Sequence, residues 1–287
     1  MESNKGFRKF YREEKPEKEE QEMEEPVKPK KKRQRVSAST LTSIQNRSED
    51  ELIRLNKFLA HSGVCSRREA DKHIQAGMVK VNGEVIKEMG HKVHPTDRIQ
   101  YDGKTLKREK LVYVLLNKPK GFITSMDDPF ERKTVMSLVE HAVKERIYPV
   151  GRLDRNTTGL LLFTNDGQMA KKLTHPSHQI KKIYHVTLDK DLELEHFETI
   201  MNEGVDLEDG LIKPDAIAYV YDDNKREIGI EIHSGKNRIV RRIFEKFDYQ
   251  VFKLDRVKFG GLTKKDLPRS KWRFLTLPEI NMLKVLS

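Results

Sequence analysis

Residues 151–166 read Gly151-Arg-Leu-Asp-Arg-Asn-Thr-Thr-Gly-Leu-Leu-Leu-Phe-Thr-Asn-Asp166, and the rest of the chain is organised around them. The first half is polar and rich in turn formers, whereas residues 160–163 form an unbroken apolar run that is too short for a helix. This order predicts a loop that leads into a buried strand. Asp154 then lies on a loop that a rigid element supports, which is a common place for a reactive carboxylate. The same residues are also typical of a simple Asx or Ser/Thr turn.

The composition indicates a basic protein with a hydrophobic core. The chain has 287 residues, 36% of them hydrophobic, which allows one small and one larger domain. Its 56 Lys and Arg against 45 Asp and Glu give a net charge of +11, which suits a polyanion such as RNA or an anionic membrane surface equally well.

Several function classes are disfavoured by simple counts. No apolar run approaches the roughly 18 residues of a membrane-spanning helix, and the first residues lack the apolar region of a signal peptide. The single cysteine, Cys65, excludes an internal disulfide and a cysteine-cluster metal site. We therefore expect a cytoplasmic protein.

Residues 1–50 are predicted to be a disordered, charged tail. They contain acidic runs and the basic run Lys28-Pro-Lys-Lys-Lys-Arg33, with few apolar residues to offset the entropy lost on ordering. The basic run can add nonspecific phosphate contacts, or it can be a solvated linker.

Residues 51–105 are predicted to form a small domain of two helices followed by strands. Apolar residues at helical spacing predict a first helix from Leu52. Ser66-Arg-Arg-Glu69 is a capping box that opens a second helix, which ends near Gly77. Asn82-Gly83, between two short alternating runs, is the strongest short signal for a hairpin turn.

This block resembles the S4 RNA-binding domain. The similarity rests on Arg54-Leu-Asn-Lys-Phe-Leu-Ala-His-Ser-Gly-Val-Cys-Ser-Arg-Arg-Glu-Ala-Asp71 and on Gly-x-Val-x-Val-Asn-Gly at residues 77–83. The resemblance implies that side chains on the helix pair bind RNA. The matching positions are Arg54, Lys57, Ser66, Arg67, Arg68 and Lys72. From the residues alone, an ordinary charged helix face explains the basic side chains as well.

Residues 106–110 are predicted to be a linker, and residues 111–287 a larger domain. The apolar run 111–116 predicts a buried strand that Asn117-Lys-Pro-Lys-Gly121 ends, because proline cannot continue a central strand. The remaining pattern predicts helices at 134–146, 167–173, 191–201, from 239 and at the C-terminal end, strands at 180–188 and 228–233, and a turn at 204–210.

Three motifs of the larger region resemble the bacterial ribosomal RNA pseudouridine synthases of the RsuA/RluB type. Gly-Arg-Leu-Asp-x-x-Thr-x-Gly-Leu-Leu-Leu at residues 151–162 matches the family signature, whose Asp is catalytic, and this implies that role for Asp154. Lys-x-Tyr at residues 182–184 implies an active-site role for Tyr184, although a core tyrosine is its usual interpretation. The family also implies an α+β fold, in which a small S4-like domain precedes a larger catalytic domain with a mixed, mainly antiparallel sheet.

The third motif is Gly-Lys-x-x-x-Val-Arg-Arg at residues 235–242. Arg241 and Arg242 are adjacent, so on a helix they diverge by about 100 degrees and cannot both face one pocket. The family pattern selects Arg241 as the residue that points at the Asp. Many members have His-Gln where this chain has Arg238-Ile239, which leaves the role of Arg238 open.

The reaction that the resemblance implies needs few groups and no cofactor. Uridine becomes pseudouridine when the C1'–N1 bond breaks, the base turns, and C1' joins C5, with no net redox change. Asp154 would act either as nucleophile or as the base that takes the C2' proton. Arg241 would keep it ionised, and Tyr184 would stack on the uracil. The family motifs imply further RNA contacts at Lys118, Arg152, Thr157 and Lys236.

Other schemes fit the sequence less well. A glycosidase needs two cooperating carboxylates, a metal site needs clustered ligands, and nucleotide hydrolysis needs a phosphate-binding glycine-rich loop. The competing class is a noncatalytic S4-domain RNA-binding or ribosome-assembly factor, in which Asp154 would be dispensable. Similarity at Asp128-Pro129, His175-Pro176-Ser177 and Lys236-Asn237-Arg238 favours large-subunit RNA as the substrate. We expect a monomer without a bound metal.

Overall fold

The computed structural model describes residues 52–286, and the predicted tail lies outside the described residues. The described chain divides into two compact units, residues 52–109 and residues 110–286. The predicted linker reaches into the first unit, because Leu106 packs against its core and Glu109 N donates to His61 O at 3.1 Å.

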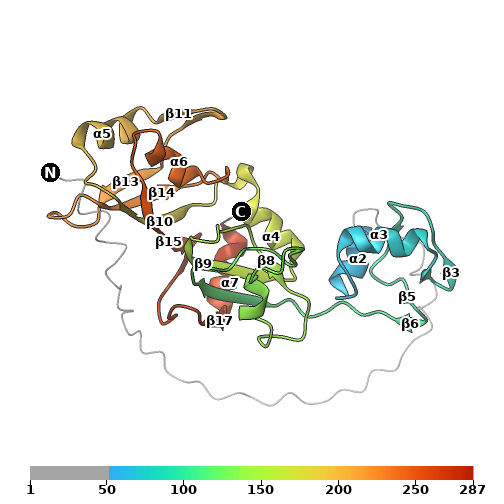
Figure 1. Cartoon of the computed structure of the whole chain (residues 1–287). Helices are drawn as coiled ribbons and strands as arrows, with labels where there is room; N and C mark the ends of the chain where they lie inside the picture. Colours follow the sequence, from blue (N-terminus) through green and yellow to red (C-terminus); the bar gives the residue numbers. More distant parts are fainter. Residues whose placement is uncertain (1–51, 287) are drawn as a thin grey trace, which may run out of the picture. The chain divides into compact units, whose positions relative to one another are not determined.

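The smaller unit packs two helices against short strands (Figure 1). Its elements are β1 (Ile53–Arg54), α2 (Leu55–His61), α3 (Arg67–Gln75), β2 (Val79–Val81), β3 (Glu84–Val85), β4 (Lys92–Val93), β5 (Ile99–Tyr101) and β6 (Lys104–Thr105). The main sheet has the order β3-β2-β5-β6, and β1 pairs with β4. The first helix begins later than predicted, because Leu52 is exposed and the next two residues pair with β4 as an extended segment.

Two predicted signals in this unit are confirmed. Ser66 caps α3, since its hydroxyl accepts from Glu69 N at 3.3 Å while the Glu69 carboxylate accepts from Ser66 N at 2.7 Å. Asn82 and Gly83 both have positive φ values, 52° and 97°, which match the two central positions of the turn that joins β2 to β3.

The larger unit is built on one twisted sheet that helices cover (Figure 1). Its strands are β7 (Tyr113–Lys118), β8 (Tyr148–Pro149), β9 (Thr158–Thr164), β10 (Lys182–Leu188), β11 (Val205–Leu207), β12 (Gly210–Ile212), β13 (Ala216–Tyr219), β14 (Glu227–Ile232), β15 (Val251–Phe259), β16 (Leu262–Thr263) and β17 (Trp272–Phe274). Its helices are α4 (Gly167–Thr174), α5 (Leu194–Asn202), α6 (Ile239–Glu245) and α7 (Leu277–Val285), with short 3-10 helices η2 (Val135–Leu138) and η3 (Pro176–His178).

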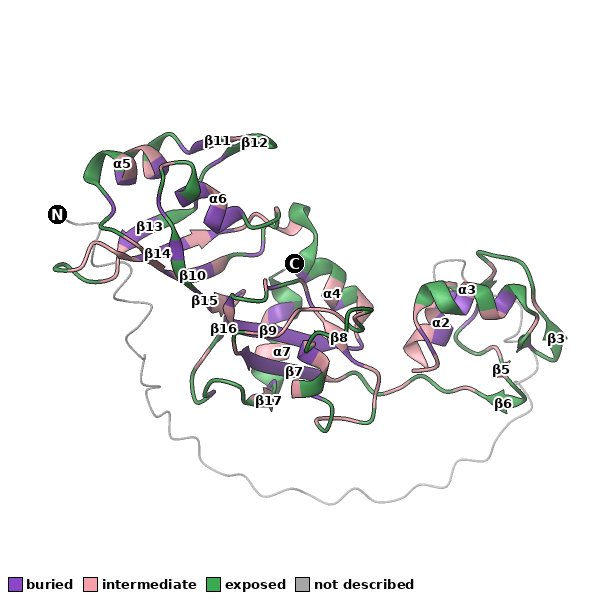
Figure 2. Cartoon of the chain, viewed as in Figure 1, coloured by how far each residue is buried: buried purple, intermediate pink, exposed green. Residues whose placement is uncertain are grey.

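The main path of the sheet runs β13-β14-β10-β15-β9-β7-β17. Neighbouring strands are antiparallel except β9 and β15, which are parallel, so the predicted α+β class with a mixed, mainly antiparallel sheet is confirmed. Figure 2 shows the buried residues concentrated on these central strands. The β11–β12 hairpin forms a separate two-stranded sheet.

The apolar run 160–163 forms the middle of β9, and all four side chains are 0% exposed. Leu160 and Leu162 pack into the cluster that α4 and α7 cover, whereas Leu161 and Phe163 pack into the cluster beside η2. A strand that is buried on both faces needs a continuous apolar run, which is why this segment lacks alternation.

Gly159 allows β9 to approach β15 closely. Its φ is +112°, and a Cβ atom there would lie 2.3 Å from the main-chain oxygen of Arg256 and 2.5 Å from its nitrogen. A residue with a side chain would therefore meet both an unfavourable backbone conformation and a rigid main chain. This glycine joins the Asp154 loop to the centre of the sheet.

Two predicted elements differ from the structure. The helix predicted at 134–146 is reduced to η2, because one turn already buries Val135 and brings Val139 into the same core cluster. The β-branched side chains of these valines lower the helix propensity of the segment. The turn predicted at 204–210 is instead the β11–β12 hairpin. Val205 and Ile212 pair across it and are both buried, which holds the two strands together.

Candidate active site

The loop that carries Asp154 is held by the preceding loop. Thr124 Oγ1 donates to Leu153 O at 2.7 Å and accepts from Leu153 N at 3.1 Å. Thr157 N donates to the main-chain oxygen of Asp154 at 3.1 Å, which closes the turn. Within residues 52–286 the Asp154 carboxylate accepts no hydrogen bond, so it does not act as the side chain of an Asx turn.

Lys118 lies beneath this loop. Its side chain is 0% exposed, and Nζ donates to the main-chain oxygens of Asp154 at 2.9 Å, Arg155 at 3.3 Å and Thr157 at 2.7 Å. The ammonium group therefore fixes the curvature of the loop from inside. The carbonyl groups that it binds enclose Lys118, which assigns it a structural role, and its contact with RNA stays a prediction.

Arg241 and Arg242 point in different directions, as helical geometry predicted. Arg241 Nε lies 3.9 Å from Asp154 Oδ2, and Arg241 Nη1 donates to Val251 O at 2.7 Å. Arg242 forms two hydrogen bonds to Asp209 at 2.6 and 3.0 Å. Burial lowers the pKa of Arg241 and the Asp154 charge opposes that shift, but a guanidinium stays protonated in either case.

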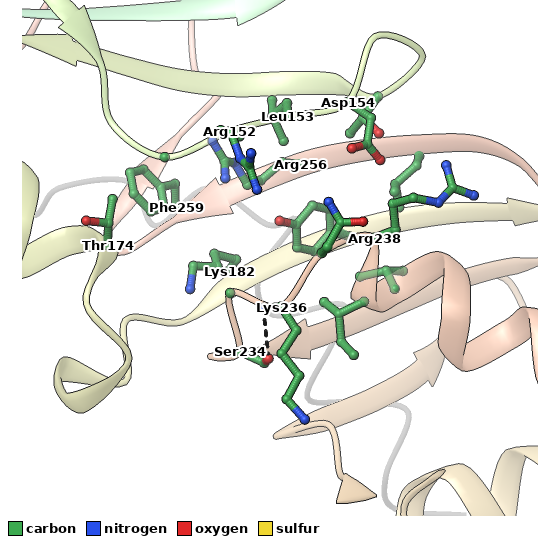
Figure 3. A pocket seen from close by; sticks show the side chains of 18 of the residues that line it. Arg152, Leu153, Asp154, Thr174, Lys182, Ser234, Lys236, Arg238, Arg256 and Phe259 are labelled. Carbon is green, nitrogen blue, oxygen red and sulfur yellow. Dashed lines mark hydrogen bonds between the residues drawn. The ribbon is translucent and has the colours of Figure 1, made fainter. Parts of the chain in front are cut away.

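A cavity of about 250 Å³ opens beside Asp154 (Figure 3). Tyr184 lines it from β10, Asp154 from the loop before β9, and residues 234–238 from the segment before α6. The fold therefore brings Asp154 and Tyr184 to one cavity from segments 30 residues apart in sequence. Arg241 contacts Asp154 from α6.

Arg152, Thr157 and Lys236 also line this cavity. Arg152 is exposed, so its charge can reach a ligand. Thr157 is 2% exposed, and its Oγ1 has no hydrogen-bond partner among the described residues. Lys236 Nζ donates to the main-chain oxygen of Asp209 at 2.5 Å, which ties this lysine to the β11–β12 hairpin.

The residues that we predicted to bind RNA in the smaller unit lie on or beside its helices. Ser66 uses its hydroxyl to cap α3, as described above. Lys57 is half-buried in α2. The remaining ones are exposed: Arg54, Arg67, Arg68 and Lys72.

Two cations at the cavity were missing from our sequence predictions. Lys182 Nζ donates to His233 O at 2.7 Å, and burial together with the charge of Arg256 lowers the pKa of Lys182 to about 8. Arg256 is 3% exposed in β15. Lys182 belongs to the Lys-x-Tyr motif, which could have indicated it. Arg256 is a lone arginine within β15, so no local pattern marks it.

Within residues 52–286, no three His, Cys, Asp or Glu side chains gather in a way that could hold a metal ion. In the same range, no helix is long and apolar enough to cross a membrane.

Comparisons with known proteins agree with this arrangement. The family model described as RNA pseudouridylate synthase matches residues 112–246, and the S4 domain model matches residues 53–99. The ribosomal large subunit pseudouridine synthase B of Bacillus subtilis is 41% identical over 237 residues, which cover 82% of this chain and 96% of that protein.

Two further matches extend over similar lengths. An uncharacterized RNA pseudouridine synthase of Aquifex aeolicus is 39% identical and covers 80% of this chain and 93% of its own length. A crystal structure of a pseudouridylate synthase matches with a TM-score of 0.57 and 31% identity, over 80% of this chain and 99% of that one. The chain therefore belongs to the RNA pseudouridine synthase family and carries an S4 domain ahead of its synthase domain.

Proposed function

We propose that this protein converts a specific uridine of large-subunit ribosomal RNA into pseudouridine. The observation that carries the proposal is the contact between Asp154 and Arg241 at a cavity that Tyr184 also lines. A module that only binds RNA has no need for an isolated carboxylate held beside a buried arginine. The 41% identity to the large-subunit enzyme of Bacillus subtilis supports the choice of RNA.

Asp154 is the proposed catalytic residue. Its carboxylate accepts no hydrogen bond among residues 52–286, so its oxygens are available to the ribose of a bound nucleotide. Asp154 acts there either as nucleophile at C1' or as the base that removes the C2' proton. The isomerisation has no net redox change and needs no energy input, so the proposed mechanism uses no cofactor.

Arg241 and Tyr184 have separate proposed roles. At 3.9 Å, the Arg241 charge favours the ionised form of Asp154 without occupying its oxygens in a short hydrogen bond. Tyr184 stacks on the uracil after its release from ribose and assists loss of the C5 proton. Both roles require the base to enter the cavity, so the target nucleotide must leave its stack.

RNA binding is proposed to involve both units. At the cavity, the exposed Arg152 and the half-buried Lys236 supply positive charge, and Thr157 shapes its wall. The S4 domain, proposed to span residues 51–105, grips RNA through Lys57, Ser66 and the exposed side chains of Arg54, Arg67, Arg68 and Lys72. Phosphate contacts of this kind position the substrate rather than select the base. We further propose that the protein acts as a monomer in the cytoplasm, where ribosomal RNA is found.

Mapping of pseudouridine in ribosomal RNA tests the proposal. In a strain that lacks the gene, carbodiimide treatment and primer extension should reveal one missing stop in large-subunit RNA. The wild-type gene should restore the stop, and Asp154→Asn should not. Asp206→Asn, which changes an exposed carboxylate on β11, is the matched control and should restore it.

Two outcomes would contradict the proposal. An unchanged pattern of stops in both ribosomal RNAs would favour the noncatalytic RNA-binding alternative. Restoration of the stop by Asp154→Asn would remove Asp154 from the chemistry.

A further inference from the structure

Arg256 is a buried cation without a counter-ion. It is 3% exposed, and its Nε donates to Leu160 O at 2.8 Å. Its guanidinium carbon lies 4.7 Å from the ring centroid of Phe259. Nη2 is buried without a hydrogen-bond partner, and within residues 52–286 no carboxylate forms an ion pair with Arg256. A charge buried in this way costs folding free energy, and proteins retain such features where function uses them.

Arg256 lies beside the residue on which we propose that uracil stacks. In the antiparallel ladder of β10 and β15, Tyr184 and Arg256 are direct partners, so their side chains emerge on the same face of the sheet. Lys182 lies two residues before Tyr184 and lines the same cavity. Figure 3 shows Lys182 across the pocket from Asp154. Arg256 and Lys182 thus line the same cavity as the Asp154 carboxylate.

We propose that Arg256, assisted by Lys182, stabilises the negative charge of the uracil base after its bond to ribose has broken. This inference rests on the proposed function. When the C1'–N1 bond breaks, its electron pair stays on the base, which becomes an anion with charge spread over N1, O2 and O4. C1' meanwhile forms a bond to the Asp154 carboxylate, or it forms a double bond to C2' when Asp154 takes the C2' proton. When C5 forms its bond to C1', the Asp154 ester bond breaks or Asp154 returns the proton to C2'. C5 then loses its proton and N1 gains one, so the base ends neutral.

The burial of Arg256 favours the base over a phosphate as its ligand. An extruded nucleotide enters a pocket base first, and its phosphates stay on the strand outside. Arg256 is almost fully enclosed, whereas Arg152 at the same cavity is exposed and can meet a phosphate. A fixed cation that is already desolvated stabilises developing charge without reorganisation at the moment of reaction.

A change of leaving group tests the proposal directly. Single-turnover rates of C1'–N1 bond cleavage should be measured on RNA with uridine or 5-fluorouridine at the target position, because fluorine stabilises the uracil anion by itself. Cleavage is the step to compare, since C5 of 5-fluorouridine has no proton to lose afterwards. Arg256→Met should lower the uridine rate by about 100-fold or more. The loss with 5-fluorouridine should be about tenfold smaller. Arg256→Lys, which keeps the charge, should recover part of the uridine rate.

Binding and stability measurements separate the alternatives. The affinity of Arg256→Met for RNA and its salt dependence should equal those of the wild type. Its melting temperature should change little, because the loss of the hydrogen bond to Leu160 O is offset by the removal of an unpaired buried charge. Lys182→Met should lower the uridine rate by a smaller factor than Arg256→Met does. Its loss should likewise be smaller with 5-fluorouridine than with uridine. The matched control is Lys181→Met, which removes an exposed lysine that pairs with Glu231, and it should behave as wild type.

The proposal is overturned if Arg256→Met lowers the single-turnover rate by the same factor with uridine and with 5-fluorouridine. A weaker affinity with a salt slope shallower by about 0.7 to 0.9 would assign Arg256 to a phosphate instead. If Arg256→Met does not fold, the test passes to Arg256→Lys and Lys182→Met. The proposal is then overturned if each of these variants shows equal rate losses with uridine and with 5-fluorouridine. Failure of the proposed function is distinct, because the wild-type protein would then form no pseudouridine in this RNA.

Discussion

Arg241 lies close to Asp154 but forms no short hydrogen bond with it: Nε is 3.9 Å from Oδ2, while Nη1 donates to Val251 O at 2.7 Å. The main-chain oxygen at the start of β15 therefore sets the position of the guanidinium group. Because the arginine is held by the strand, its charge acts on the carboxylate while the carboxylate oxygens stay accessible. A bidentate pair would have ionised Asp154 equally well but would have occupied both oxygens.

Replacement of each of the two adjacent arginines by Met, in separate variants, gives a matched test of this relationship. Arg241→Met should lower turnover by about 100-fold or more, since Asp154 loses the charge that favours its ionised form. Arg242→Met breaks only the ion pair with Asp209 and should leave stability almost unchanged, because solvent screens an ion pair at the surface. Release of tritium from C5-labelled uridine RNA measures both rates. Equal losses in the two variants would show that the contact with Asp154 is not what matters.

Lys118→Met should destabilise the fold rather than weaken RNA binding. The buried main-chain oxygens of the Asp154 loop would lose a charged donor, at a cost of about 2–4 kcal/mol in the free energy of unfolding. Lys120→Met changes an exposed lysine two residues away and should leave stability unchanged. Urea unfolding measures the difference. If Lys118→Met were as stable as Lys120→Met but bound RNA more weakly, the structural role assigned to Lys118 would be wrong.

The S4 domain can be tested separately from the chemistry. Replacement of both Arg67 and Arg68 by Ala should make the slope of log affinity against log salt shallower by about 1 to 2, because each lost phosphate contact removes roughly 0.7 to 0.9. The rate at saturating RNA should hardly change, since only ground-state binding is lost. Lys104→Ala on β6 is an exposed control. A fall in the saturated rate would mean that the S4 domain also positions the target base.

The pH dependence of activity should report on Lys182. Its pKa is lowered to about 8 by burial and by Arg256, with Asp215 acting in the opposite direction. If the charge of Lys182 is needed, kcat/KM should fall as the pH rises through about 8. Lys182→Arg carries a charge that does not titrate in this range, so its profile should stay flat up to about pH 9. A wild-type profile that coincides with that of Lys182→Arg would argue against a catalytic use of the charge.

Stability should show the opposite trend with pH. The pKa of Lys182 in the folded chain is below the ordinary value of 10.5, so the unfolded chain binds more protons between about pH 8 and 10.5. The contribution of Lys182 to the free energy of unfolding should therefore rise with pH across this window. Urea unfolding of the wild type and of Lys182→Met at several pH values measures this contribution by difference.

Local patterns predicted the elements whose signals lie within a few residues. The capping box at Ser66, the Asn82-Gly83 turn and the apolar run of β9 each depend on neighbours in sequence, and all three appear as predicted. The helix predicted at 134–146 was overestimated, because apolar spacing cannot tell one helical turn from three when the core needs only two anchors.

The sequence by itself determined the Asp154 loop and showed that Arg241 and Arg242 cannot face one pocket, because turn signals and helical geometry act over short distances. The resemblance of its motifs to a known family selected Arg241 and gave the class of protein. Only the tertiary structure decided that Lys118 is enclosed beneath the loop and that Arg256 lies beside Tyr184 without a counter-ion. Both follow from the pairing of strands distant in the chain. That pairing decides whether a cation faces solvent, a group of main-chain carbonyls or a pocket. A local sequence pattern does not contain this information.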